Sequence, residues 1–111
     1  MKILEIKSSN GENEIKFKEL TIKAEWQFWN DYGVLSLKVF KNNKVIGGAH
    51  LESKGKNAPF VADDLYVNKE FQRRGIATKM YDYITKLGFK VEKSSDLSPD
   101  GEAFWKKYNK K

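Results

Sequence analysis

Hydrophobic and polar residues alternate along much of the first half of the chain. From Leu20 to Phe28 every second residue is apolar without exception, a spacing typical of a strand with one buried face. A helical face with a four-residue spacing is the competing interpretation of this segment, and we favour strands because the alternation is unbroken. Ile15 and Phe17 alternate in the opposite phase, so we expect a turn or bulge near 18–19.

Further strands are predicted on both sides of this segment. Alternation indicates a short strand over residues 2–7, and the Ser, Asn and Gly content of residues 8–13 is typical of a turn. Residues 34–41 and 44–51 form a predicted hairpin. Asn42-Asn43 suits its tight turn, because asparagine tolerates a positive φ.

In the second half of the chain the period of the pattern changes from two to three or four. A loop over 52–59 precedes a strand over 61–67, on which Val61, Leu65 and Val67 share one face. A helical face follows, formed by Ile76, Met80, Ile84 and Leu87. Gly88 suits the position just after a helix end.

A short strand and a last helix complete the predicted elements. Residues 89–91 are expected to return parallel to the 61–67 strand, through a right-handed crossover. Ser98 can cap the last helix and Pro99 suits its first position. The side chains carried by this helix include Ala103, Phe104, Trp105 and Tyr108.

A basic turn, Gln72-Arg73-Arg74-Gly75, separates the predicted strand from the predicted helix. A helix start offers unpaired N–H groups and a positive dipole end, which favour an anionic phosphate, and Gly75 allows close backbone approach. Arginines in the first turn oppose the helix dipole, which costs about 0.3–1 kcal/mol of stability unless an anion is bound there. No Gly-Lys-Ser/Thr follows the glycine, which excludes a Walker-type loop, and the Gly-x-Gly-x-x-Gly triplet of dinucleotide-binding folds is also absent. The alternative is a helix with a basic first turn and an incidental glycine.

Composition limits the possible classes of protein but indicates no particular binding site. The 111 residues allow one domain, and the net charge of +6 is spread evenly, with ten Lys/Arg against seven Asp/Glu in 1–60 and eleven against eight in 61–111. The chain has no cysteine, which excludes disulfides, thiolate nucleophiles and Cys-ligated zinc. The sequence shows neither an apolar run of membrane-spanning length nor a signal-peptide core, so we expect a cytoplasmic protein with no membrane partner.

The basic turn and its flanks resemble motif A of the GNAT superfamily of acyl-CoA N-acyltransferases, Gln/Arg-x-x-Gly-x-Gly/Ala. Here it reads Gln72-Arg73-Arg74-Gly75-Ile76-Ala77, with Val67 five residues ahead. The resemblance implies an α/β (α+β) fold: a mixed, mostly antiparallel sheet with a cofactor-binding helix after the central strand and a C-terminal helix. It implies one domain over 1–111, with N-terminal strands in 1–52, the motif A strand, loop and helix in 60–87, and a strand and helix in 89–109.

The resemblance also implies acetyl-CoA as cosubstrate and no metal. In the family, amides of the motif A loop bind the pyrophosphate, and the preceding strand pairs with the pantetheine arm where it splays from the next parallel strand. The residues that this carries over are Leu65, Tyr66 and Val67 for pantetheine, and Gln72, Arg73, Arg74, Gly75, Ile76, Ala77 and Thr78 for the phosphates, with Lys79 nearby.

Catalytic candidates are fewer. Acyl transfer to an amine needs a base for the ammonium proton and an acid for the thiolate. The family often has an acidic residue on the motif A strand, where Asp63 and Asp64 stand on opposite faces unless a bulge intervenes; solvated carboxylates are the alternative for each. The family's acid is a tyrosine four residues after an alanine, and Tyr108 is one position late, which favours packing. We expect His50, the one histidine, to be a surface or packing residue.

Two departures from the family shape the functional prediction. Members usually have two helices between the first strand and the hairpin, whereas here no helical pattern stands between Lys7 and Val34. Members also usually have two strands after the last helix, where this chain stops at Lys111. A protein acceptor or a second copy of the chain could close the missing wall. We expect direct acetyl transfer in a ternary complex to a primary amine, a protein lysine in acidic surroundings since the chain is basic. The alternatives are a non-catalytic CoA-binding or protein-interaction module and, less favoured, a nucleic-acid-binding protein.

Overall fold

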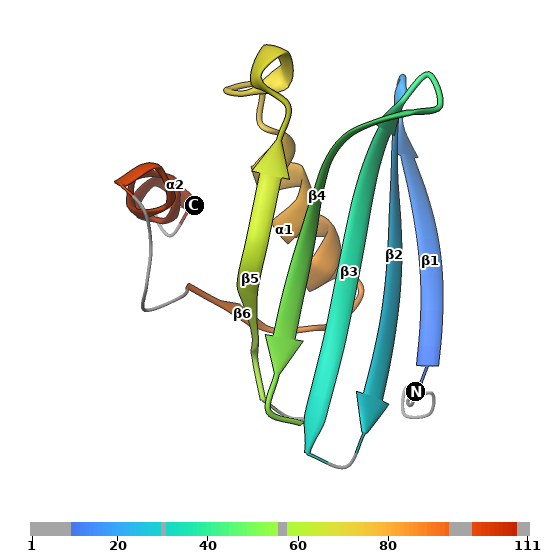
Figure 1. The fold of residues 1–111 in the computed structure, drawn as a ribbon, viewed down its shortest axis with the longest axis vertical. Helices are drawn as coiled ribbons and strands as arrows, with labels where there is room; N and C mark the ends of the chain where they lie inside the picture. The colour runs from blue at the N-terminus through green and yellow to red at the C-terminus, as the bar shows by residue number, and fades with distance from the viewer. Residues whose placement is uncertain (1–9, 30, 56–57, 94–98, 109–111) are drawn as a thin grey trace.

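The computed structural model describes residues 10–29, 31–55, 58–93 and 99–108. Six strands form one sheet in sequential order, with antiparallel neighbours except for the parallel pair β5 and β6 (Figure 1). The strands are β1 (Asn10–Phe17), β2 (Leu20–Trp29), β3 (Tyr32–Lys41), β4 (Lys44–Ser53), β5 (Phe60–Val67) and β6 (Val91–Glu92). The helices are α1 (Ile76–Lys86) and α2 (Pro99–Tyr108). This mixed, mostly antiparallel α+β architecture confirms the predicted fold class.

The turns between the first four strands follow the prediction. β1 ends and β2 begins around Lys18, whose φ is 55°. Asn42 and Asn43, with φ of 52° and 69°, connect β3 to β4. These positive φ values match the turn types that let antiparallel strands continue with their natural twist.

Of the two predictions for the N-terminal segment, one is partly wrong and the other lies outside the described residues. The turn predicted over 8–13 is wrong for 10–13, because β1 starts at Asn10 and pairs with β2 from there, opposite Gln27. Pairing along a whole strand outweighs local turn propensity. The strand predicted over 2–7 lies outside the described residues. The loop expected from 52 begins later, since β4 extends to Ser53.

A bulge in β5 corrects the face assigned to this strand. His50 pairs with Asp64 and Leu51 with Ala62, so Asp63 is an extra residue without a partner on β4. An extra residue reverses the alternation on one side of the bulge. Ala62 and Leu65 therefore face the core, and Val61 does not share their face, contrary to the prediction.

The helix prediction is confirmed. α1 buries Ile76, Met80 and Ile84, and Gly88 follows it with φ of 100°, donating its amide to the Thr85 carbonyl. β6 begins at Val91, two residues later than predicted. α2 confirms the last predicted helix, and the capping role of Ser98 lies outside the described residues.

Aromatic rings pack on the side of the sheet where the helices lie. The Phe89 ring packs against the rings of Trp26, Phe28 and Phe60 beneath the sheet, at centroid distances of 5.2 to 6.1 Å. Trp105 of α2 packs against Tyr81 of α1 at 4.9 Å. The hydrophobic core therefore lies between the sheet and the helices.

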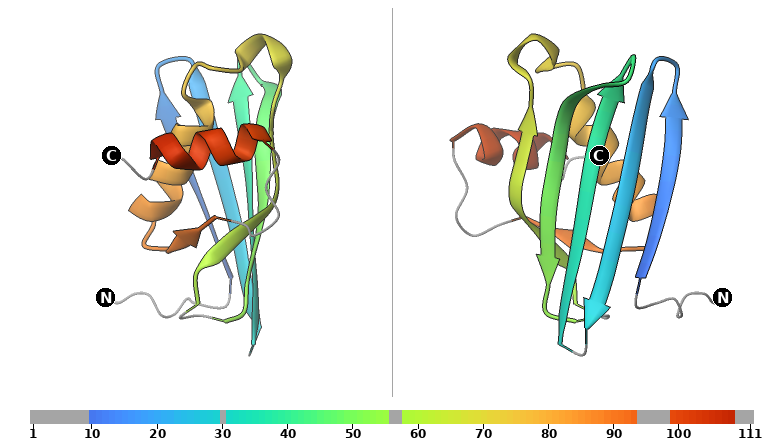
Figure 2. Two further views of the ribbon diagram at one scale, coloured as in Figure 1. Left: turned by 90° about the vertical axis from the view of Figure 1, so that its left-hand side faces the viewer. Right: turned by 45° about the vertical axis from the view of Figure 1, so that its right-hand side comes forward.

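The helices leave one face of the sheet uncovered. α1 lies behind the sheet and α2 stands beside β5, so within the described ranges no helix covers the side facing the viewer in Figure 1 (Figures 1 and 2). We call this side the open face. Trp29, Tyr32 and Tyr66 are exposed by 48%, 39% and 46%.

Neither α1 nor α2, the helices that the structure describes, has the length and apolar character needed to cross a membrane.

Alkaline pH should unfold the protein partly through Tyr81. Burial of this ring, with Tyr108 nearby, raises the pKa of Tyr81 to about 12. An unfolded tyrosine ionises near pH 10, so this contribution to the free energy of unfolding is constant below about pH 10 and falls between about pH 10 and 12. In urea unfolding followed by circular dichroism, we expect Tyr81→Phe to lose less stability between pH 9 and 11.5 than the parent. Equal losses would contradict this assignment.

Candidate functional site

The loop between β5 and α1 has an unusual backbone. A short 3₁₀ turn over Lys69–Phe71 leads to an extended Gln72, and then Arg73 and Gly75 both adopt positive φ, of 64° and 79°. The Gln72 side-chain amide donates to the Val67 carbonyl at 2.9 Å. Gln72 therefore ties the loop to the end of β5, which fixes where the helix begins.

Unpaired amides gather at the start of α1. Lys79 donates its amide to the Gly75 carbonyl at 3.0 Å, so the amides of Ile76, Ala77 and Thr78, one turn earlier, have no acceptor within the helix. No side chain caps this end, and the first turn has no acidic residue. Among the described residues, therefore, neither a capping side chain nor a carboxylate of the first turn compensates the positive end of the helix dipole.

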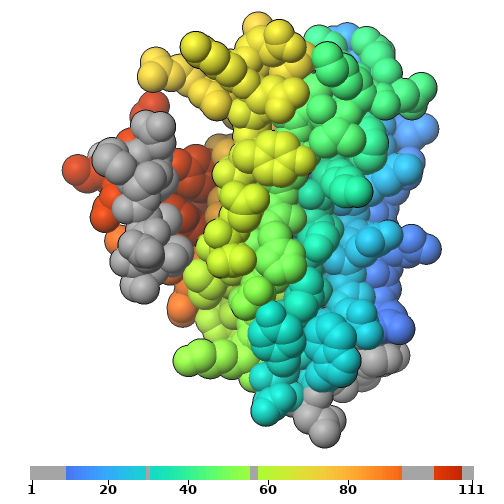
Figure 3. Space-filling model, viewed as in Figure 1, coloured from blue at the N-terminus to red at the C-terminus, as the bar shows by residue number. Residues whose placement is uncertain are grey.

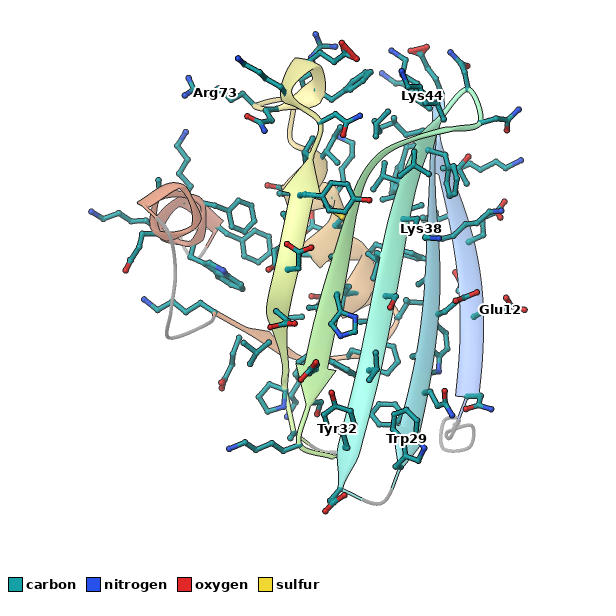
Figure 4. All side chains as sticks on the ribbon, viewed as in Figure 1. Glu12, Trp29, Tyr32, Lys38, Lys44 and Arg73 are labelled. Atoms are coloured by element: carbon teal, nitrogen blue, oxygen red, sulfur yellow. The ribbon has the colours of Figure 1, made fainter. Side chains whose placement is uncertain are left out.

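Three cationic side chains belong to this loop and the first turn of α1: Arg73, Arg74 and Lys79. Arg73 and Arg74 are exposed, and Figure 4 shows Arg73 at the outer edge of the loop. The Arg74 guanidinium lies 5.7 Å from the centre of the Phe71 ring. The Lys79 ammonium nitrogen would lie 3.9 Å from a Cβ on Gly75. Amides, dipole and cations together fit a phosphate or pyrophosphate group.

The outer edge of β5 is open beside the 68–75 loop. β5 pairs with β6 at Phe60 and Val61, and from Ala62 to Val67 this edge has no strand partner among the described residues. The strands splay apart here, and in the space-filling view a gap separates α2 from the 68–75 loop beside β5 (Figure 3). The backbone at Leu65 and Tyr66 can therefore pair with an extended, amide-bearing chain.

The bulge places both aspartates on the solvent side. Asp63 and Asp64 are exposed, and Asp64 pairs in register with His50. The ligand atoms of His50, Glu52 and Asp63 all lie within 4.8 Å of one another. The imidazole Nε2 of His50 is 3.2 Å from a Glu52 carboxylate oxygen. We call His50, Glu52 and Asp63 the polar cluster.

Tyr32 extends this group. A hydrogen bond to the Glu52 carboxylate raises the pKa of Tyr32, and the negative charges of Glu52 and Asp63 act in the same direction. The polar cluster and Tyr32 together combine an imidazole, two carboxylates and a phenol on neighbouring strands. Such a set can accept a proton, hold an ammonium group or ligate a divalent cation.

Tyr108 is not near this group. Its hydroxyl donates to Asp82 of α1 at 3.0 Å, and its ring stacks on Phe104 of the same helix. Burial raises the pKa of Tyr108, and the hydrogen bond with Asp82 adds to the effect. Because α1 and the core lie on the opposite side of the sheet from the polar cluster, the structure does not bring Tyr108 to Asp63 or Asp64.

The sequence alone predicts a surface or packing role for His50 and does not single out Glu52. Their spacing, His-x-Glu on one hairpin strand, is a detectable signal, because residues two apart on a strand share a face. What it could not supply was the position of Asp63, which depends on the bulge. The polar cluster is therefore a product of pairing between β4 and β5.

Comparison with known proteins identifies the family. The model of the acetyltransferase (GNAT) family matches residues 2–106. Searches of curated proteins and of solved structures give no significant match. The family match covers nearly the whole chain, including β5, the 68–75 loop and α1. The chain therefore belongs to the GNAT acetyltransferase family.

Proposed function

We propose that this protein moves an acetyl group from acetyl-CoA to a primary amine, with the lysine side chain of another protein as the acceptor. The observation that carries the proposal is the combination of an uncapped helix start at Gly75 with the unpaired edge of β5 directly before it. One element suits a pyrophosphate and the other suits the amide-bearing pantetheine arm. A helix start alone would accommodate any anion.

The cradle residues divide into two roles. The amides of Ile76, Ala77 and Thr78 would bind pyrophosphate oxygens, and Arg73 and Arg74 would neutralise their charge. The backbone of β5 at Leu65, Tyr66 and Val67 would pair with pantetheine, although the Val67 carbonyl already accepts the Gln72 amide. Gln72 then acts by positioning the loop rather than by contacting the ligand.

The transfer itself requires two protons to leave the acceptor ammonium group, one before the attack and one after it. The neutral amine nitrogen bonds to the acetyl carbonyl carbon and the carbon–sulfur bond breaks. The nitrogen then gives its second proton to solvent, and CoA leaves as a thiolate that takes up a proton from solvent. We assign removal of the ammonium proton to the polar cluster, with Asp63 as the base. Thioester chemistry of this kind needs no metal ion and no covalent enzyme intermediate.

The open face favours a macromolecular acceptor. Small-ligand pockets bury most of their ligand, whereas the polar cluster is solvent-accessible on an uncovered sheet. A protein acceptor brings its own surface to close the site, and exposed Trp29 and Tyr32 can anchor it. A second copy of the chain would be the competing source of a wall, and small amines would then become acceptors.

The test separates binding from turnover. Calorimetry should show acetyl-CoA binding to the full chain, with free acetate binding far more weakly. Acetylation of lysine-containing peptides and of small amines is then followed by mass spectrometry and thiol release. Absence of acetyl-CoA binding would refute the proposal, and efficient acetylation of small amines with no peptide modified would refute the macromolecular acceptor.

The position of Tyr108 favours one rival, a non-catalytic CoA-binding module. With its hydroxyl bonded to Asp82, this tyrosine cannot protonate the leaving thiolate from its present position. The same experiment decides. Tight acetyl-CoA binding without thiol release above the buffer rate, for any peptide or amine acceptor, would support the rival.

A further inference from the structure

Strand register aligns a row of polar side chains across the open face. Glu12 pairs with Glu25, Glu25 with Ser36, Ser36 with His50, and His50 with Asp64. Directly paired side chains project from the same face. We call Glu12, Glu25, Ser36, His50 and Asp64 the acidic row; it crosses five strands and ends beside Glu52 and Asp63.

The charge of this row is not neutralised within the described residues. Neither Glu12 nor Glu25 forms an ion pair there, although the chain carries a net charge of +6. Like charges directly opposite on a sheet are destabilising. In the next row toward the 68–75 loop, Glu14 is instead paired with Lys23 at 3.8 Å. The acidic row is thus a local exception on a basic protein.

The open face is also hollowed and lined with aromatic rings. A depression of about 460 Å³ includes Glu12, Glu25, Trp29 and Ser36 in its lining. The rings of Trp29 and Tyr32 lie 5.8 Å apart at the end of the sheet opposite Arg73 (Figure 4). Carboxylates beside exposed aromatic faces attract cationic side chains by both charge and cation–π contact.

We propose that the open face binds a basic polypeptide segment, extended along the acidic row, with the target lysine ammonium at the polar cluster. Five strands about 4.8 Å apart span about 19 Å, the length of about six extended residues. That the bound lysine is acetylated rests on the proposed function; the binding does not. The overall positive charge favours an acidic neighbourhood around the target lysine, whereas the local charge of the acidic row favours a basic one.

Fluorescence anisotropy tests the binding without turnover. The probe is a labelled ten-residue peptide with one central lysine flanked by arginines, added to the full chain without acetyl-CoA. We expect the double variant Glu12→Gln/Glu25→Gln to weaken binding about tenfold, since each exposed ion pair contributes up to about fivefold. The variant should also melt at a higher temperature, because a like-charge pair is removed.

A matched control removes the same charge elsewhere. Glu70→Gln/Glu102→Gln alters two exposed carboxylates, on the 3₁₀ turn and α2, and should bind the peptide like the parent. Equal weakening by both double variants, or no weakening by the first, would overturn the proposal. Tighter binding of an acidic peptide, or of spermidine, would overturn the choice of occupant. Acetyl-CoA calorimetry on the same samples reports separately on the proposed function.

Discussion

Gly75→Trp should abolish acetyl-CoA binding, with a loss of more than about a hundredfold in affinity. The φ of Gly75 is 79°, a value that costs other residues about 1–2 kcal/mol. A Cβ there would meet little of the protein, since its nearest neighbour is the Lys79 ammonium nitrogen at 3.9 Å. The added side chain would therefore fill the space that the pyrophosphate requires. Calorimetry measures the affinity, and urea unfolding measures the stability.

Gly88→Trp provides the matched control. Gly88 also has a positive φ, of 100°, and a Cβ there would meet nothing within 4 Å. It lies at the opposite end of α1, so this variant should lose similar stability while binding acetyl-CoA like the parent. If Gly75→Trp binds as tightly as the parent, the cradle is misplaced. If both variants lose binding equally, backbone strain and not ligand overlap is the cause.

Local spacing made the loop and the helix start at Gly75 predictable from sequence. The change of period after Val67, the basic turn and Gly75 all lie within a short segment whose conformation depends mainly on its own residues. The same holds for the Asn42-Asn43 turn, where side-chain chemistry selects the backbone. Alternation over 20–28 predicted a strand correctly because one face of β2 is buried.

Features that depend on pairing between distant segments could not be predicted. The bulge at Asp63 exists because β4 and β5 change register, and it alone moves Val61 from the predicted face. β1 includes the turn-like residues 10–13 because β2 offers them a complete partner. The acidic row joins positions as far apart as Glu12 and Asp64, whose alignment requires four strand pairings to be known.

Asp63→Asn should lower the maximal acetylation rate about a hundredfold and leave the affinity for acetyl-CoA unchanged. General base catalysis contributes about 10²–10⁴-fold, and asparagine keeps the shape of the side chain without accepting a proton at neutral pH. Asp63 is chosen over Asp64 because its carboxylate lies within 4.8 Å of the ligand atoms of His50 and Glu52. Steady-state kinetics with the best peptide acceptor measures the rate.

Asp64→Asn is the matched control, since it removes another exposed carboxylate from the next position of the same strand. We expect it to weaken peptide binding slightly and to leave the maximal rate within about threefold of the parent, as removal of one exposed charge has little effect. Tyr108→Phe should be equally mild, because its hydroxyl bonds Asp82 away from the polar cluster. Small, equal effects of both aspartate variants would instead indicate that the amine loses its proton to water.

Loss of activity on chelator treatment, restored by zinc, would assign the polar cluster to a metal ion rather than to a base.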